Sequence, residues 1–292
     1  MNQLRFSDAK RFNNVVKKYL ARHEAENNLV LGILANVLTG EYRDIDPYMA
    51  LIQDQGEILQ VMLRTPPFPV LFSYRQEAPD DEMADLAVGG LQDAYGDQIG
   101  GMTGDQQVVK SYAALWGQVT QADPVVKTAM RLYKLNQVHP VSGVPGTLRL
   151  ATMDDLALVM SWFGGFQRET LGVEDDAKRL RNSVCHYLTG NKRHRGMAVW
   201  EVEGRPVSMA GYSGPTQHGI RISAVYTPPD LRGNGYASAC VAALSQYLLD
   251  QGYRFCFLFT DVEHPTPNHI YRDIGYRPVS DVDKVVFKKN GG

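Results

Sequence analysis

A short glycine-containing segment carries the residue types that bind phosphate groups. Arg232, Gly233 and Gly235 stand between a strand pattern that ends at Thr227 and an apolar helical pattern. Backbone N–H groups in a glycine turn and at a helix N-terminus attract anions, and glycine lets phosphate oxygens approach the backbone closely. The segment therefore predicts a phosphate or diphosphate site. Its expected binding residues are Arg232, Gly233, Asn234, Gly235, Tyr236, Ala237 and Ser238.

Two common nucleotide-binding fingerprints do not fit this segment. The dinucleotide fingerprint needs a third glycine, and Ser238 stands at that position. No string in the chain matches the P-loop, which needs Gly-Lys followed by Ser or Thr. The hypothesis that the protein is a nucleotide-dependent oxidoreductase depends on Gly233 and Gly235 alone. We keep it as an alternative, behind the two functions described below.

A second motif lies downstream and makes the resemblance to a family specific. Arg232, Gly235 and Ala237 fit the pattern Arg/Gln-x-x-Gly-x-Gly/Ala. Segment 264–276 fits Asn-Pro-x-x-x-x-Leu-Tyr-x-x-x-Gly-Phe/Tyr at its proline, tyrosine, glycine and final aromatic residue, with His264 in place of the asparagine. In this order the two motifs resemble those of the GNAT superfamily of acyl-CoA-dependent N-acetyltransferases.

The resemblance implies acetyl-CoA as co-substrate and no metal. It also implies that backbone groups of Val225 and Thr227 pair with the pantetheine arm, that N–H groups of 233–238 hold the pyrophosphate, and that His264 approaches the cofactor. Tyr271 would lie near the thioester sulfur. The implied activity is acetyl transfer to a primary amine of a small molecule or peptide, by direct attack on the thioester. The alternative is a non-catalytic module that binds acyl-CoA for regulation.

The chemistry requires a proton acceptor, because an alkylamine with a pKa of about 10.4 is protonated near neutral pH. The candidate bases include Glu169, at the end of the first helix pair of the second half, and Glu201 and Glu203, which share one face of a strand. His218 is a further candidate, and each of these residues also fits an ordinary solvent-exposed position. Tyr271 is expected to hydrogen-bond the leaving thiolate, because a phenol with a pKa of about 10 is a weak full proton donor.

The second half has the element order of a mixed, mostly antiparallel sheet flanked by helices, an α/β (α+β) fold. The clearest helix follows Gly235 and is stopped by Gly252. The expected elements are strand 147–151, helices 153–164 and 173–189, strands 196–203, 206–213 and 219–227, helix 235–251, strand 254–260, helix 266–274 and two terminal strands near 277–280 and 283–288.

A proline- and glycine-rich seam at 138–146 predicts a domain boundary near residue 142. Segments 227–237 and 264–276 are similar to a GNAT subgroup with a degenerate N-terminal half. The resemblance implies a degenerate GNAT-like domain at 1–141 and a catalytic GNAT domain at 142–292.

The first half loosely mimics the second in element order. We expect the glycine-rich turn 96–104 to be the counterpart of the phosphate-binding segment. It lacks the Arg/Gln-x-x-Gly-x-Gly/Ala pattern, and Asp105 would repel a phosphate, so this half is expected to bind no CoA. The expected elements are helices 8–21, 27–38, 80–95 and 105–119 and strands 48–53, 57–64, 69–74 and 125–136.

Composition and apolar patterning narrow the classes of partner and of membrane association. The 292 residues include 30 Lys and Arg against 32 Asp and Glu, so the net charge of -2 favours neither nucleic acid nor an anionic membrane as partner. The longest apolar run, 29–38, is short of the roughly 20 residues that span a bilayer. The first residues show no secretory signal pattern.

The cysteine and histidine spacing predicts neither disulfides nor a metal site. Cys185, Cys240 and Cys256 are far apart in the sequence, and His264 and His269 lack the i, i+4 spacing of a zinc helix. We therefore expect a cytoplasmic enzyme, with monomer and homodimer both open.

Overall fold

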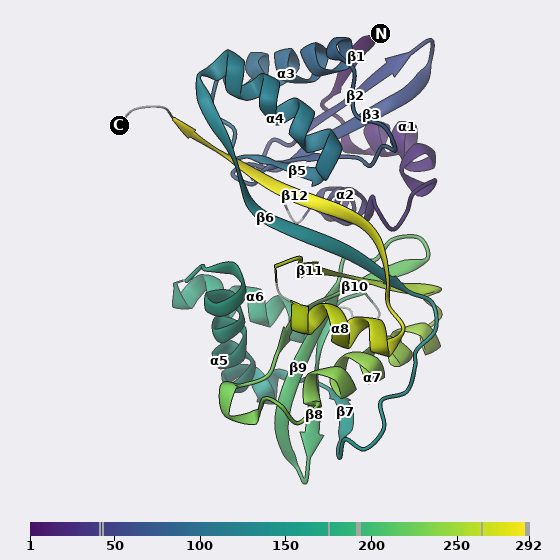
Figure 1. Ribbon diagram of the computed structural model, residues 1–292, viewed down its shortest axis with the longest axis vertical. Helices are drawn as coiled ribbons and strands as arrows, with labels where there is room; N and C mark the ends of the chain where they lie inside the picture. Colours follow the sequence, from purple (N-terminus) through teal and green to yellow (C-terminus); the bar gives the residue numbers. More distant parts are fainter. Residues whose placement is uncertain (41, 43, 175, 191–193, 264, 290–292) are drawn as a thin grey trace. The chain divides into compact units, whose positions relative to one another are not determined.

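The computed structural model describes residues 1–40, 42, 44–174, 176–190, 194–263 and 265–289 (Figure 1). By internal contacts the chain divides into two compact units. The first is Met1–Leu132 with Thr260–Glu263 and Val279–Gly292, and the second is Tyr133–Phe259 with His264–Pro278. The last strand thus belongs to the first unit, because it pairs with β5, whereas the sequence seam placed the whole C-terminus in the second domain. The functional division into 1–141 and 142–292 stays a prediction.

The first unit has four helices among its described residues. In its sheet the strand order is β1-β2-β3-β4-β5-β12-β6, and β4 and β5 are parallel. Its elements are β1 (Asn2–Phe6), α1 (Ala9–Ala21), α2 (Asn28–Thr39), β2 (Tyr48–Asp54), β3 (Glu57–Arg64), β4 (Val70–Phe72), α3 (Asp81–Tyr95), β5 (Met102–Asp105), α4 (Gln106–Thr120) and most of β6 (Ala122–Leu135) and β12 (Arg277–Lys289).

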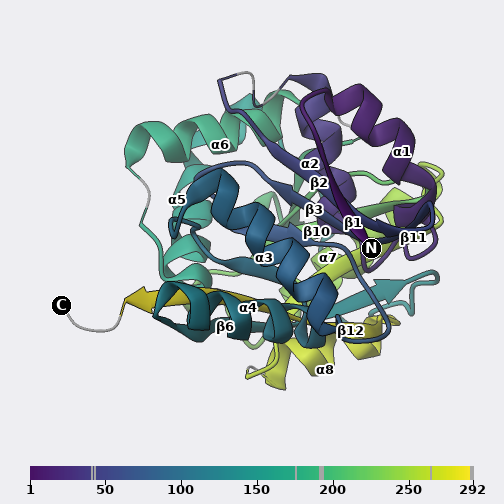
Figure 2. The same cartoon turned by 90° about the horizontal axis from the view of Figure 1, so that it is seen from above.

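In this unit, a side-chain cap fixes where α1 begins, and alternation of side chains along a strand determines which helices each sheet face contacts. The Asp8 carboxylate accepts a hydrogen bond from the Arg11 N–H at 2.8 Å and caps α1. Along β2, Met49 and Leu51 pack with α1 and α2, whereas Ala50 and Ile52 pack with α3 and α4. Helices α3 and α4 run beside each other (Figure 2). Both faces of the sheet are therefore buried.

The second unit has the sheet order β11-β10-β9-β8-β7. Its strands are antiparallel except for the β10–β11 pair. Its elements are β7 (Thr147–Leu150), a 3₁₀ turn (Met153–Asp155), α5 (Leu156–Phe166), a π-turn (Gln167–Leu171), α6 (Ala177–Thr189), β8 (Gly196–Val202), β9 (Arg205–Ser213), β10 (Gly219–Tyr226), a 3₁₀ turn (Pro229–Leu231), α7 (Tyr236–Asp250), β11 (Phe255–Asp261) and α8 (Pro265–Ile274).

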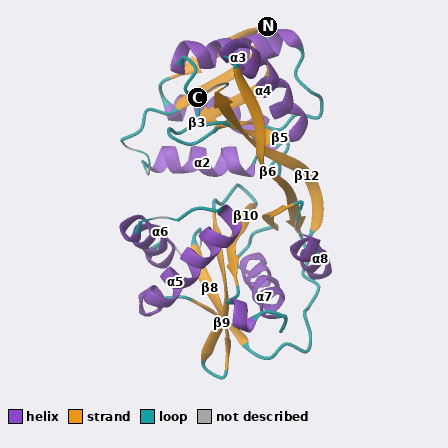
Figure 3. Cartoon of the chain, turned by 60° about the vertical axis from the view of Figure 1, so that its left-hand side comes forward, coloured by secondary structure: helices purple, strands orange, loops and turns teal. Residues whose placement is uncertain are grey.

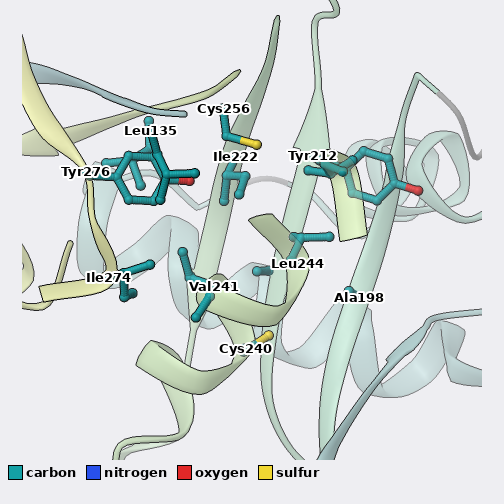
Figure 4. Close-up of a cluster of buried hydrophobic side chains, with 14 of the residues drawn as sticks. Leu135, Ala198, Tyr212, Ile222, Cys240, Val241, Leu244, Cys256, Ile274 and Tyr276 are labelled. Atoms are coloured by element: carbon teal, nitrogen blue, oxygen red, sulfur yellow. The ribbon is translucent and has the colours of Figure 1, made fainter. Parts of the chain in front are cut away.

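Helices cover both faces of this second sheet. Figure 3 shows α5 and α6 along one side of β8–β10 and α7 along the other. Along β8, Met197 and Val199 join the α5/α6 core, and Ala198 joins the α7/α8 core. Figure 4 shows Val241 and Leu244 of α7 directed into the α7/α8 core. The predicted α/β architecture with a mostly antiparallel sheet is confirmed.

Several local predictions were wrong. The two terminal strands are one strand, β12, because pairing with β5 continues across residues 282–285 without a turn. Strand β1 was missed, because its five residues lack clear alternation. Part of the glycine-rich turn 96–104 is strand β5. Helix 173–189 begins only at Ala177, where Asp176 supplies the cap. Among the described residues no helix is long and apolar enough to cross a bilayer.

Candidate active site

The site begins where two parallel strands separate. The register of β10 with β11 runs from Gly219 opposite Phe255 to Arg221 opposite Phe257 and stops there. Both strands continue, β10 to Tyr226 and β11 to Asp261. The edge of β10 that faces β11 is therefore left without a strand partner along its C-terminal half. An extended ligand can pair with such an edge as an additional strand does.

A β-bulge lies in the same part of β10. The register with β9 skips from Ser223 to Tyr226 on β10 while advancing only from Gly211 to Met209 on β9. Ala224 has a φ of 50°, and neither strand register includes Ala224 or Val225. The bulge inserts one residue and turns the backbone groups around Val225 away from the sheet ladder.

Residues 232–238, the phosphate-type segment, follow β10 and the 3₁₀ turn Pro229–Leu231 and lead into α7. Gly233 and Gly235 have φ values of 82° and 76°, the left-handed region that glycine tolerates best. Gly235 is the N-cap of α7 and supplies no side-chain cap, so the first N–H groups of the helix stay available to an anion. A Cβ atom at Gly233 would meet no atom within 4 Å, whereas one at Gly235 would lie 2.9 Å from Val144 Cγ2. An open, glycine-containing helix start of this kind has the features of an anion-binding cradle.

Asn234 and Arg232 brace the segment from within. The Asn234 side-chain amide donates to the Leu231 carbonyl at 3.1 Å. Arg232 Nε donates to the Thr227 carbonyl at 2.9 Å. The Thr227 hydroxyl lies 2.9 Å from the Ser208 hydroxyl, so the side chain of Thr227 is engaged in the sheet. Of the two residues expected to pair with a pantetheine arm, Val225 is outside both strand registers, and the Thr227 carbonyl already accepts from Arg232.

Glu169 joins this segment from the π-turn after α5. Its Oε2 accepts from Arg232 Nη2 at 2.6 Å, and its Oε1 accepts from the Tyr226 hydroxyl at 2.9 Å. The Arg232 guanidinium holds the pKa of Glu169 below its usual range, and Tyr226 adds to this. Burial, together with the bond to Glu169, raises the pKa of Tyr226. A carboxylate held in this way is a weak base.

The other predicted bases lie elsewhere in the unit. Glu203 stands in the exposed turn between β8 and β9 with a φ of 49°, not on a strand face with Glu201 as predicted. Glu201 accepts from Arg149 Nε at 2.6 Å and belongs to an ion-pair cluster with Asp155. His218 precedes β10, at the opposite end of the strand from the bulge. The structure therefore brings only Glu169 to the phosphate-type segment.

Tyr271 lies on α8, half-buried against the α7/α8 core. Its ring meets the Tyr276 ring edge-on with centroids 5.9 Å apart. Burial, with a smaller effect of the neighbouring Cys240 thiol, raises the pKa of Tyr271 to about 12. Its hydroxyl is thus a hydrogen-bond donor and not a proton donor near neutral pH. His264, expected to approach the cofactor, lies outside the described residues.

Sequence reasoning missed three polar residues around the bulge. Tyr226 bonds Glu169, and a Cβ atom at Gly165 on α5 would meet its hydroxyl, so the tyrosine packs closely on that helix. The Tyr187 hydroxyl on α6 lies 3.4 Å from the Ser223 hydroxyl. Tyr226 could have been found from its place between Val225 and Thr227. Tyr187 is distant in sequence and gives no local signal.

The N-terminal unit has its own parallel pair, β4 and β5, connected through α3 as β10 and β11 are connected through α7. The counterpart of the phosphate-type segment is therefore the loop before α3, and the expectation for 96–104 was wrong. The Asp80 carboxylate caps α3 by accepting from the Met83 N–H at 2.9 Å, and Asp81 and Glu82 fill the first turn. This helix N-terminus is occupied and acidic.

No metal site appears in the described part of the chain. There, no group of three or more His, Cys, Asp and Glu side chains is placed to hold an ion. The cysteines Cys185, Cys240 and Cys256 are free.

Comparisons with known proteins agree with this geometry. Residues 158–276 match the acetyltransferase (GNAT) family. No curated protein matches the chain in sequence. A GCN5-related N-acetyltransferase from Sphaerobacter thermophilus is similar in structure, with a TM-score of 0.63 and 14% identity over 99% of this chain and 96% of that chain. An acetyltransferase from the GNAT family of Colwellia psychrerythraea has a TM-score of 0.58 and 9% identity over 99% of this chain and 100% of that chain.

A two-domain relative covers both halves of the chain. It is a tandem GNAT protein from the clavulanic acid biosynthesis pathway, with a TM-score of 0.57 and 11% identity over 100% of this chain and 99% of that chain. Likenesses at such low identity show the fold alone. They confirm the predicted architecture, a GNAT fold preceded by a GNAT-like N-terminal half.

Proposed function

We propose, from the premise that residues 158–276 form an acetyltransferase domain of the GNAT family, that the protein transfers an acetyl group from acetyl-CoA to a primary amine. The acceptor belongs to a small molecule or a peptide. The near-neutral net charge of -2 provides no broad electrostatic attraction for a polyanionic acceptor.

The observation that carries the proposal is the divergence of β10 from β11 directly before an uncapped, glycine-containing helix start. A CoA molecule needs a strand edge for its amide-rich arm and an anion cradle for its diphosphate, next to each other. The strand edge around Val225 and the glycine-containing helix start at 233–238 supply these two features on either side of one short turn. Arg232 lies beside the cradle and adds positive charge.

Each residue of the candidate site has a separate role in the proposed reaction. The amine nitrogen attacks the thioester carbon, the bond from that carbon to sulfur breaks, and the proton lost by the amine passes through water to the departing thiolate. A backbone N–H freed by the bulge, at Val225, can donate to the thioester carbonyl oxygen. Tyr271, protonated because its pKa is about 12, donates a hydrogen bond to the leaving sulfur. Glu169 positions Arg232 and Tyr226. Glu203 has no role in this proposal.

The direct test is thiol release from acetyl-CoA in the presence of aliphatic, aromatic and peptidyl primary amines. We expect at least one class to accelerate thiol release above the rate without amine, with one acetylated amine formed per thiol. Matched secondary amides, which are not nucleophilic, serve as the control. If acetyl-CoA binds but no amine accelerates release, the protein is not an amine acetyltransferase with these acceptors.

A second candidate function is an acyl-CoA-binding module without turnover. It is favoured by one observation, because the single predicted base near the segment, Glu169, is already ion-paired with Arg232. If the protein is such a binding module, we expect tight, stoichiometric acetyl-CoA binding with no product on prolonged incubation. If the protein is an enzyme, we expect the amount of product to rise with time. The same assay therefore distinguishes the two candidate functions.

A further inference from the structure

A cavity in the N-terminal unit has no role in the proposed reaction. It has a volume of about 300 Å³ and lies between α2 and the sheet. Leu29 and Ile33 of α2 form one wall, and Phe68 lies at the mouth with 57% of its surface exposed. Its volume is at the lower end of the range for small-molecule pockets, about 300–1,000 Å³.

The floor of the cavity is a row of side chains across neighbouring strands. Leu71 on β4 is opposite Thr103 on β5, and Thr103 is opposite Lys284 on β12. Facing partners in a sheet point to the same side, so these three side chains line one surface. Leu71, Thr103 and Lys284 all border the cavity. The row runs from an apolar end to a cationic end.

Lys284 has no anionic partner in the described part of the chain. Asp283, its neighbour, points to the opposite face, where Val285 packs with α3 and α4. Asp281 shares that alternation and is bonded to Arg131 Nε at 2.7 Å. Burial, and then the like charge of Lys127, lowers the pKa of Lys284. A half-buried ammonium group without a counter-charge is costly, and an anion would relieve that cost.

We propose that this cavity binds a small organic carboxylate with an apolar body. The carboxylate pairs with the Lys284 ammonium and accepts a hydrogen bond from the Thr103 hydroxyl. The apolar body fills the space between Ile33 and Leu71. The ligand site is formed by residues of the N-terminal unit alone and needs no turnover.

The test is isothermal titration of the full chain with hexanoate, hexanamide and acetate. Hexanoate should bind, hexanamide should bind at least about tenfold more weakly because it lacks the charge, and acetate should bind weakly because it lacks the apolar body. Lys284→Met should weaken hexanoate about tenfold or more and leave hexanamide unchanged. Lys288→Met, on the same strand and exposed, is the matched control and should not change either affinity.

A second variant tests the cavity without changing the charge of Lys284. Ile33→Trp fills the cavity from α2 and should abolish binding of both hexanoate and hexanamide. Thermal unfolding checks each fold, and Lys284→Gln replaces Lys284→Met if the latter does not fold. The proposal is overturned if hexanoate does not bind the wild type, if hexanamide binds equally well, or if loss of the Lys284 charge leaves hexanoate affinity unchanged.

Discussion

At the scale of single residues, Arg232 is shared between two tasks. Its Nε holds the Thr227 carbonyl, and its Nη2 is paired with Glu169 at 2.6 Å. The pair is solvent-exposed on both sides, so it is weak and open to exchange. A diphosphate at the segment would compete with Glu169 for the guanidinium. Glu169 is therefore better placed to set the availability of Arg232 than to accept a proton from an amine.

Glu169→Gln tests that assignment. We expect CoA to bind about two- to fivefold more tightly, because an exposed ion pair that competes with the ligand is removed. The acid limb of the kcat profile should stay where it is in the wild type. Titration of CoA and a pH series check the two expectations. Glu174→Gln, on the same connection, is the control. Loss of the acid limb, with unchanged CoA affinity, would instead make Glu169 the base.

Tyr271→Phe tests the proposed donor. The ring and its contact with Tyr276 stay, so the fold and CoA affinity should change little. Turnover should fall by about 10- to 1,000-fold if the hydroxyl hydrogen-bonds the leaving sulfur. Rapid-quench kinetics must show that chemistry is rate-limiting. An unchanged kcat under that condition would leave Tyr271 with a packing role only.

The raised pKa of Tyr271 predicts the direction in which the stability of the fold changes with pH. The pKa of Tyr271 is about 12 in the folded protein, above the value of about 10 for an unfolded tyrosine. Its contribution to stability is thus complete below pH 10 and is lost as the pH rises through 12. Denaturant unfolding between pH 9 and pH 12 should show a decline that is shallower in Tyr271→Phe. An equally steep decline in both proteins would place the raised pKa elsewhere.

At the scale of elements, the sequence predicted what local patterns encode. The helix after Gly235 and the glycine segment itself both depend on residues close in sequence. Strand pairing depends on distant residues, so the divergence of β10 from β11 and the bulge at Ala224 had no local signal. The fusion of the last two strands into β12 depends likewise on its partner β5.

The site shows the same division between local and distant signals. The cradle was visible because its residues are consecutive. The partner of Arg232 was proposed only as one base among several, since Glu169 is 63 residues away in sequence. Glu203 was misplaced on a strand because Glu203 and Gly204 lie in a tight turn with positive φ values of 49° and 76°.

Gly233→Asp tests the cradle at the scale of the loop. The space around Gly233 is open, so the side chain itself fits, whereas a substitution at Gly235 would also press on Val144. The new carboxylate would repel the diphosphate, and CoA affinity should fall about tenfold or more. Gly233→Asn has nearly the same shape and backbone preference without the charge. It should retain most of the thermal stabilisation by CoA that Gly233→Asp loses.

The asparagine control separates charge from backbone strain. If both variants lose stabilisation equally, the strain at a φ of 82° is the cause and the charge argument fails. If neither loses it, CoA does not bind at this segment.

At the scale of the whole molecule, two GNAT-like units differ in the start of one helix. In the C-terminal unit α7 begins at Gly235 without a side-chain cap. In the N-terminal unit α3 begins with Asp80, Asp81 and Glu82. The Asp80 carboxylate accepts from the Met83 N–H, and all three carboxylates place negative charge at the start of the helix. The two units therefore share a helix between parallel strands, but only the C-terminal one leaves the start of that helix without a side-chain cap.

The resulting prediction is one CoA site in each chain. Isothermal titration with CoA should give a stoichiometry of about one, and Gly233→Asp should remove that single binding event. The acidic start of α3 disfavours a second site, because three carboxylates next to a diphosphate repel it and the Asp80 carboxylate already accepts from the Met83 N–H. Asp81→Asn with Glu82→Gln should not create a second site, since the Asp80 cap remains. Two equivalent binding events in the wild type, or one that survives Gly233→Asp, would contradict the assignment of CoA to the C-terminal unit.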